Sequence, residues 1–409
     1  GTFVPVNGEG YFVNTSGGVS TANLPAGSAG AIVSFADYTR TFATNALTVV
    51  PNGSEKIGGV AASALLTVNG QAATFIYVDG TEGWINTQET QTTQTGLPPY
   101  ITATGGTVTC SGDYRIHTFT GPGSFVVTSA GNAAPSSGTG SNKVDYLVVA
   151  AGGSGGSGYG AGGGAGGYRE SPGADNGSYT VSPLGASPAV SLSVITNTTY
   201  PITVGAGGAQ IPAGGPGSGA LGPSGGVSTF STITSAGGGG GGGSTGPSAP
   251  NPTADGADGG SGGGASWDGP GTGGTALGGT GNTPPVSPAQ GKNGGHGRHL
   301  GPSYSSQGGG GGAISKGADQ QPGTDGNVGG GGATSSINGT PTARAGGGGA
   351  SGTPGAGGTG GGGSGNPSPV PARDGGINTG GGGGGANPSA SYTGAGGSGI
   401  VILRYKYQN

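Results

Sequence analysis

Two apolar stretches frame the glycine-rich part of this chain: VDYLVVA at residues 144–150 and GIVILRYKY at residues 399–407. Both are rich in β-branched and aromatic residues, which favour strands. The first runs directly into glycine, and the second closes the chain. An unpaired closing strand of this apolarity would be prone to aggregation. We therefore predict that the two strands pair, which brings the ends of a segment of about 250 residues together and implies an ordered interior.

The interior consists of pure glycine runs separated by loops that contain Pro, Asn, Thr and aromatic residues. Glycine supplies 110 of the 409 residues, about four times its average share of about 7%. Charged residues make up only 7% of the chain, whereas globular domains average about 25%. A disordered Gly-Ser linker is the ordinary interpretation of such a composition. The framing strands, the similar length of the runs and the low charge favour order instead.

An ordered form is available to pure glycine. A polyproline II helix has three residues per turn and points its N–H and C=O groups outward. Helices made only of glycine can pack side by side and pair these groups with one another, because no Cβ holds them apart. We predict a bundle of such polyglycine II helices over residues 144–409, closed by the strand 399–407. The loops between helices would collect at the two ends of the bundle.

The rest of the chain also predicts β-structure, and we expect essentially no α-helix. Residues 1–89 alternate short apolar runs with turn dipeptides such as Asn52-Gly53 and Asp79-Gly80, as in a small all-β domain. Trp84 is expected to be a core or interface residue. Residues 90–99 are polar and then proline-rich, which predicts a linker, and residues 100–143 hold strands that lead into the next domain.

Composition narrows the classes of function. The basic residues are scattered singly, so we expect no nucleic-acid partner, which would require clustered Lys and Arg. No long apolar run predicts membrane insertion. Cys110 is the single cysteine, which excludes an intrachain disulfide. The chain starts at Gly1 and has no methionine, so we expect it to be a fragment or a processed piece.

We expect no enzyme, no catalytic residues and no cofactor. A GxGxxG match at residues 153–158 is expected by chance in this composition, and no helix follows to present its N-terminus to a phosphate. His296 and His299 are three residues apart, but Asp268 and Asp319 are candidate ligands only by residue type, so a solvated loop is favoured over a metal site. The thinly spread carboxylates do not predict a depolymerase.

Several motifs in order resemble the glycine-rich domain of tail-fibre and other virion proteins of tailed bacteriophages. They are YRIHTFTGPGSFVV at 114–127, VDYLVVAAGG at 144–153, YPITVGAGG at 200–208, STFSTITSAGGGGGGG at 228–243 and GAGGSGIVILRY at 394–405. Residues 1–89 resemble, more loosely, a small β-domain of phage fibre proteins. The resemblance implies a sandwich of polyglycine II helices flanked by β-strands. It also implies a place at the tip of a tail fibre, where the loops between helices touch the host receptor.

On this basis we expect a tail-fibre adhesin on the virion surface that binds a protein or glycan receptor on the host cell. The alternatives are a head fibre or capsid decoration without receptor binding, and a secreted self-assembling filament or matrix protein. We expect contacts with other virion fibre proteins and a homotrimer through residues 1–89. The receptor-binding candidates are the large residues of the predicted loop 265–307 and those after the first glycine run: Trp267, Asp268, His296, Arg298, His299, Tyr304, Tyr168 and Arg169.

Overall fold

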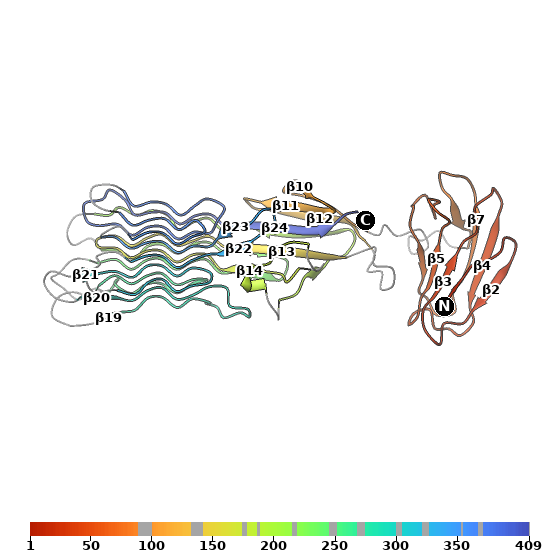
Figure 1. Ribbon diagram of the computed structural model, residues 1–409, viewed down its shortest axis with the longest axis horizontal. Helices are drawn as coiled ribbons and strands as arrows, with labels where there is room; N and C mark the ends of the chain where they lie inside the picture. The colour runs from red at the N-terminus through yellow and green to blue at the C-terminus, as the bar shows by residue number, and fades with distance from the viewer. Residues whose placement is uncertain are drawn as a thin grey trace. The chain divides into compact units, whose positions relative to one another are not determined.

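The computed structural model shows an all-β protein (Figure 1). It describes residues 1–88, 100–131, 142–173, 178–185, 189–214, 219–244, 252–267, 275–299, 305–320, 327–352, 355–366 and 371–408. Within these ranges there is no α-helix, and a 3₁₀ turn, η2, spans Pro183–Gly185. No described helix is long and apolar enough to cross a membrane. The chain forms two compact units: residues 1–102 with 129–142, and residues 103–128 with 143–409.

The first unit contains two four-stranded sheets. One has the order β1 (Thr2–Phe3), β3 (Ser20–Asn23), β5 (Leu47–Val50) and β6 (Ala64–Leu66). The other has the order β2 (Gly10–Val13), β4 (Ile32–Asp37), β7 (Ala72–Tyr77) and β8 (Trp84–Asn86). Buried and less buried residues alternate along these strands because successive side chains point to opposite faces. The predicted linker 90–99 lies outside the described residues.

The buried faces of these strands supply one hydrophobic core. Phe35, Phe75 and Trp84 are at most 2% exposed, and Phe35 meets Phe75 edge to face with ring centroids 6.1 Å apart. The indole Nε1 of Trp84 donates to Glu55 Oε2 over 3.1 Å. The prediction that Trp84 is a core residue is therefore confirmed.

The second unit begins with two sheets. The first has the order β10 (Thr107–Ser111), β11 (Tyr114–Phe119), β24 (Ile400–Lys406), β13 (Lys143–Val149) and β14 (Tyr168–Glu170), and β15 (Leu192–Ser193) also pairs with β13. The second has the order β18 (Ile233–Ser235), β17 (Ser228–Phe230), β16 (Thr198–Thr203), β12 (Gly123–Ala130) and β9 (Ile101–Thr104). Strands β22 (Ala333–Ser335) and β23 (Thr342–Arg344) form a hairpin.

The predicted pairing of the two framing strands is confirmed. β13 and β24 are antiparallel neighbours with a register from Asp145↔Arg404 to Val149↔Ile400. Aromatic side chains of this sheet pack on those of the second sheet. The ring centroids of Tyr405 and Phe125 are 6.1 Å apart, and those of Tyr146 and Phe230 are 6.4 Å apart. The paired strands therefore form a core from which the glycine segments extend.

The glycine segments, here called tracts, run as extended chain beside one another. In tract 161–167 the partners of the N–H groups repeat every third residue: one set donates to tract 236–242, the next to 308–311 and the third to 380–383. The carbonyl groups of the same tract accept from 150–156, 261–264 and residue 348. One tract thus has six neighbours. This is the arrangement expected of packed helices with three residues per turn, and the assignment as polyglycine II stays a prediction.

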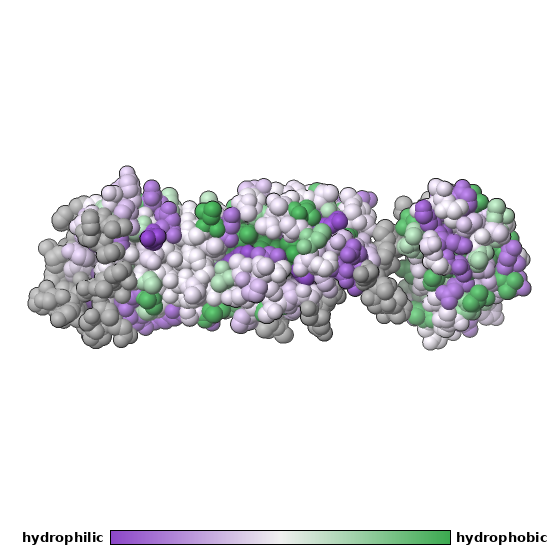
Figure 2. All heavy atoms as spheres, turned by 45° about the horizontal axis from the view of Figure 1, so that its top comes forward, coloured by the Kyte–Doolittle hydropathy of each residue, from purple (hydrophilic) through white to green (hydrophobic). Residues whose placement is uncertain are grey.

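This packing explains the requirement for glycine. A Cβ atom placed on Gly162 would lie 2.0 Å from the carbonyl oxygen of Gly348, and one on Gly163 would lie 2.2 Å from that of Gly153. Both distances are far inside van der Waals contact, and the obstructing atoms are backbone. We call this bundle of tracts the lattice. Figure 2 shows much of its visible face in pale colours, since glycine is neither strongly polar nor strongly apolar.

Candidate functional site

The chain runs back and forth through the lattice, and the lattice has one end away from the sheets, here called the outer end (Figure 1). A small antiparallel sheet lies there, made of β19 (Thr275–Ala276), β20 (Gly297–His299) and β21 (Ser305–Ser306). In its middle strand Arg298 is paired with Thr275 on one side and with Ser306 on the other. Three consecutive strands of the chain therefore meet at the outer end.

The predicted single loop 265–307 is wrong. Residues 277–281 and 291–296 are tracts of the lattice, joined by a turn over residues 282–290 at the sheet end. The position of this turn follows from Gln290, whose carbonyl accepts the N–H of Tyr168 in β14 over 2.8 Å. The segment therefore reaches the outer end twice, at β19 and again at β20 and β21. Sequence reasoning missed these tracts because they contain Leu, Thr, Lys and Asn beside glycine.

Trp267 lies at the outer end but is only 3% exposed. Its ring meets Tyr159 edge to face, with centroids 5.7 Å apart, and the neighbouring Ser266 donates its hydroxyl to the Tyr159 carbonyl over 2.7 Å. Trp267 is thus a packing anchor. Tyr159 itself is 38% exposed. Sequence analysis did not select it, although a tyrosine isolated between glycines is the signal that could have identified it.

His296 is held in place by two hydrogen bonds. Its ring Nδ1 accepts a hydrogen bond from the backbone N–H of Gly278 over 3.1 Å. Its backbone N–H donates to Asp319 Oδ1 over 2.8 Å. Burial alone would raise the pKa of Asp319, but the His296 N–H and the nearby Lys316 ammonium outweigh it and lower the pKa. His296 and Asp319 therefore belong to the hydrogen bonding of the lattice. The described residues contain no group of three His, Cys, Asp or Glu that could hold a metal ion.

Arg298 is the predicted site residue that the structure places as an exposed side chain at the outer end. Tyr392, in the reversal between tracts 381–386 and 394–399, is 48% exposed at the same end. Arginine and tyrosine are enriched among residues that dominate binding energy. Asp268 and Tyr304 lie outside the described residues, and so does the side chain of His299.

Tyr168 and Arg169 lie at the opposite, sheet end of the lattice, in β14. Tyr168 is 1% exposed, and its hydroxyl donates to Glu170 Oε2 over 3.2 Å. Burial raises the pKa values of Tyr168 and of Glu170. The prediction of Tyr168 as a receptor contact is wrong, because a side chain in this core is not accessible to a partner. Arg169 approaches the carbonyl of Thr234 at 3.5 Å, far from the outer-end residues.

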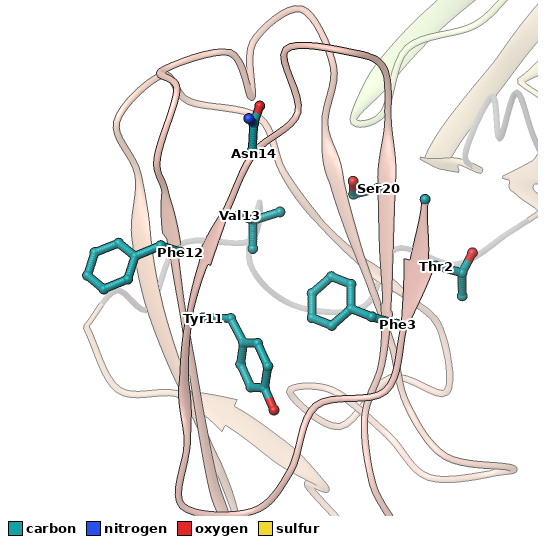
Figure 3. A pocket seen from close by; sticks show the side chains of 8 residues that line it. Thr2, Phe3, Tyr11, Phe12, Val13, Asn14 and Ser20 are labelled. Carbon is teal, nitrogen blue, oxygen red and sulfur yellow. The ribbon is translucent and has the colours of Figure 1, made fainter.

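A groove of about 420 Å³ lies in the first unit between β1 and β2. Figure 3 shows the rings of Phe3 and Tyr11 on its inner side and Phe12 directed away from it. The two inner rings have centroids 5.5 Å apart, whereas Phe12 is 81% exposed. The groove was not predicted from the sequence.

Comparison with curated proteins yields no match to the chain. A family model described as a glycine-rich domain matches residues 127–406. This range includes the paired strands β13 and β24 and all the tracts of the lattice, and it covers more than half of the sequence. The chain therefore belongs to the glycine-rich domain family.

Proposed function

We propose that this chain is a bacteriophage tail-fibre protein that binds a receptor on the host cell surface with the outer end of its lattice. The observation that carries the proposal is the gathering of exposed Arg298, Tyr159 and Tyr392 at that end, on segments that are far apart in sequence. The receptor would be a protein or a glycan, and the role is binding rather than catalysis.

The lattice supports this role through its own packing. Inside a tract most side chains would collide with a neighbouring backbone, as the Cβ positions of Gly162 and Gly163 show. Sequence can therefore vary mainly at the reversals, where binding residues on a rigid scaffold are ordinarily found. A backbone cross-linked by hydrogen bonds in six directions holds the ends of the tracts in place without a large side-chain core.

The first unit is proposed to join the fibre as a homotrimer and to contact other fibre proteins of the virion. Its surface carries large apolar side chains near β1 and β2: Val4 is 65% exposed, Val6 is 55% exposed and Phe12 is 81% exposed. Exposed apolar groups that lie close together are typical of interaction surfaces. This places the chain, in our proposal, on the surface of the virion.

Two other functions remain as alternatives. A head fibre or capsid decoration would use the same lattice without a receptor, and a secreted matrix protein would use it to form filaments. Receptor binding is favoured because the exposed arginine and tyrosines lie at a reversal end, whereas a decoration does not require such residues there.

The test uses the full-length chain, labelled with a fluorophore, on a panel of intact bacteria. Arg298→Ala should weaken binding to the recognised strain by at least about tenfold, which corresponds to 1.4 kcal/mol. Arg169→Ala, a matched arginine at the sheet end, should leave binding unchanged. Equal losses in both variants would move the contact away from the outer end. A folded chain that binds no strain would contradict the adhesin function, and filaments in electron micrographs would favour the matrix protein.

A further inference from the structure

Tract 277–281 lies at an edge of the lattice, and its N–H groups show how that edge ends. The N–H of Gly279 donates inward, to the carbonyl of Gly263 over 2.8 Å. This is the backbone pairing found throughout the interior, where tract 161–167 donates every N–H to another tract. The other N–H groups of tract 277–281 have side chains as acceptors instead.

Two of these donors face a pair of aspartates. The N–H of Leu277 donates to Asp255 Oδ1, and that of Thr280 donates to Asp258 Oδ1, each over 2.6 Å. The aspartates are three residues apart, as are their donors, so the pairing follows the period of the lattice. All four residues are exposed. These two hydrogen bonds therefore lie on the surface of the lattice.

The remaining two donors form a second row with the same period. The N–H of Gly278 donates to His296 Nδ1 over 3.1 Å, and that of Gly281 donates to Asn293 Oδ1 over 2.9 Å. Side chains of residues 293 and 296 thus occupy the positions that the carbonyls of another tract would take. Of the five consecutive N–H groups of tract 277–281, one pairs with backbone and four pair with side chains.

The same device recurs at other tracts. The exposed side chain of Asp374 accepts from the N–H of Ala395 over 2.8 Å, and that of Ser315 accepts from the N–H of Gly331 over 2.7 Å. A single contact of this kind could be incidental. Repetition at the lattice period and at several tracts indicates a common structural role.

An unsealed row of donors would fit one kind of partner particularly well. Edge donors attract further chain in β-sheets, and here the complementary partner is a glycine tract whose carbonyls repeat every three residues, about 9.3 Å apart at a rise of 3.1 Å. Every other copy of this chain carries such tracts. We propose that Asp255, Asp258, Asn293 and His296 seal this edge of the lattice against a glycine tract of a second copy of the chain.

These four side chains would block a second copy in two ways. The carboxylate, amide and imidazole acceptors satisfy the donors, so an incoming carbonyl gains no hydrogen bond that was missing. Their side-chain atoms also occupy the space into which a glycine backbone would have to come. Because asparagine fills this role at residue 293, the acceptor oxygen matters and a negative charge is not required.

The experiment compares Asp255→Ala/Asp258→Ala with Asp255→Asn/Asp258→Asn in the full-length chain. The asparagine variant keeps an acceptor of the same shape and loses only the charge. Sedimentation velocity over a range of concentrations measures self-association, and hydrogen exchange measures the protection of the Leu277 and Thr280 amides. We expect the alanine variant to lose protection at these two amides and to gain mass with concentration. The asparagine variant should match the wild type in both measurements.

Two outcomes would overturn the proposal. If the asparagine variant associates as strongly as the alanine variant, charge repulsion rather than sealing keeps the copies apart. If the alanine variant loses protection at both amides yet keeps the wild-type mass, the open edge does not recruit a second copy. Should the double alanine variant lose exchange protection in all tracts, the single variant Asp258→Ala leaves one donor open and answers the same question.

Discussion

Replacement of Gly163 by alanine tests whether the lattice depends on the absence of side chains. Gly163 lies in the middle of tract 161–167, and an added Cβ would be 2.2 Å from the carbonyl oxygen of Gly153. Since Cβ contacts below 3.0 Å are essentially never seen, the tract 150–156 must move away by about 1 Å. The obstructing atom is backbone, so no side-chain rotation can relieve the contact.

The cost follows from the hydrogen bonds that join these two tracts. Gly153 donates to Gly164 over 2.9 Å, and Gly156 donates to Ala161 over 3.0 Å. A displacement of about 1 Å lengthens both beyond hydrogen-bond distance. A buried polar group left unpaired costs about 1–3 kcal/mol, and overpacking adds about 1–3 kcal/mol. We therefore expect the free energy of unfolding of the second unit to fall by about 3–5 kcal/mol.

Differential scanning calorimetry of the full-length chain measures this effect. At about 2–4 °C per kcal/mol for a large domain, the transition of the second unit should fall by about 10 °C. Gly331→Ala is the matched control, because the nearest atoms to a Cβ there are side-chain atoms at ordinary contact distance: Ser315 Oγ at 3.4 Å, Thr359 Oγ1 at 3.5 Å and Ile314 Cγ1 at 4.0 Å. It should be neutral or slightly stabilising, since alanine reduces the entropy of the unfolded chain. Equal melting temperatures for the two variants would refute the reasoning.

Two predictions concern the first unit. Trp84→Ala should lower its free energy of unfolding by about 3–5 kcal/mol, because a fully buried ring and its hydrogen bond to Glu55 are lost; calorimetry should show the second transition unchanged, and a shift of both transitions would contradict the assignment to a separate core. Burial alone would raise the pKa of Asp37, but hydrogen bonds from the N–H groups of Gly70 and Phe42 outweigh it and lower the pKa. Its stabilising effect is therefore present above the unfolded pKa of about 3.9 and is lost as the pH falls through the lowered value. Asp37→Asn should remove this part of the acid dependence of urea unfolding, and an unchanged acid dependence would show that other groups cause it.

Much of the architecture could be predicted from local sequence. The apolar runs at 144–150 and 399–407 predicted two strands. Because such strands are prone to aggregate when unpaired, we predicted that they pair with each other, and β13 and β24 do so. The short apolar runs and turn dipeptides of residues 1–89 predicted a small all-β domain. Trp84, expected as a core or interface residue, lies in its core. Pure glycine runs predicted backbone packing, because a Cβ at most positions of a run would collide with a neighbouring backbone.

The candidate site was less predictable. Tyr168 and Trp267 were selected as large residues among glycines, yet both are buried, one at the sheet end and one at the outer end. Residue type alone does not distinguish an anchor from a contact. Arg298 is an exposed candidate because it lies in β20 at the outer end. Its position there depends on where the preceding tract, 291–296, ends.

The sequence by itself determined which segments become strands and which become tracts, because apolar runs and glycine runs each have few ways to satisfy their backbone. Only the tertiary structure decided which tract lies beside which, and so which is central and which is an edge. Tracts 161–167 and 277–281 are both glycine-rich, yet the first pairs with backbone on all sides and the second ends on side chains. The physical reason is that glycine has no side chain to specify a neighbour. The choice is therefore made by the reversals, the sheets and the polar side chains along the edges.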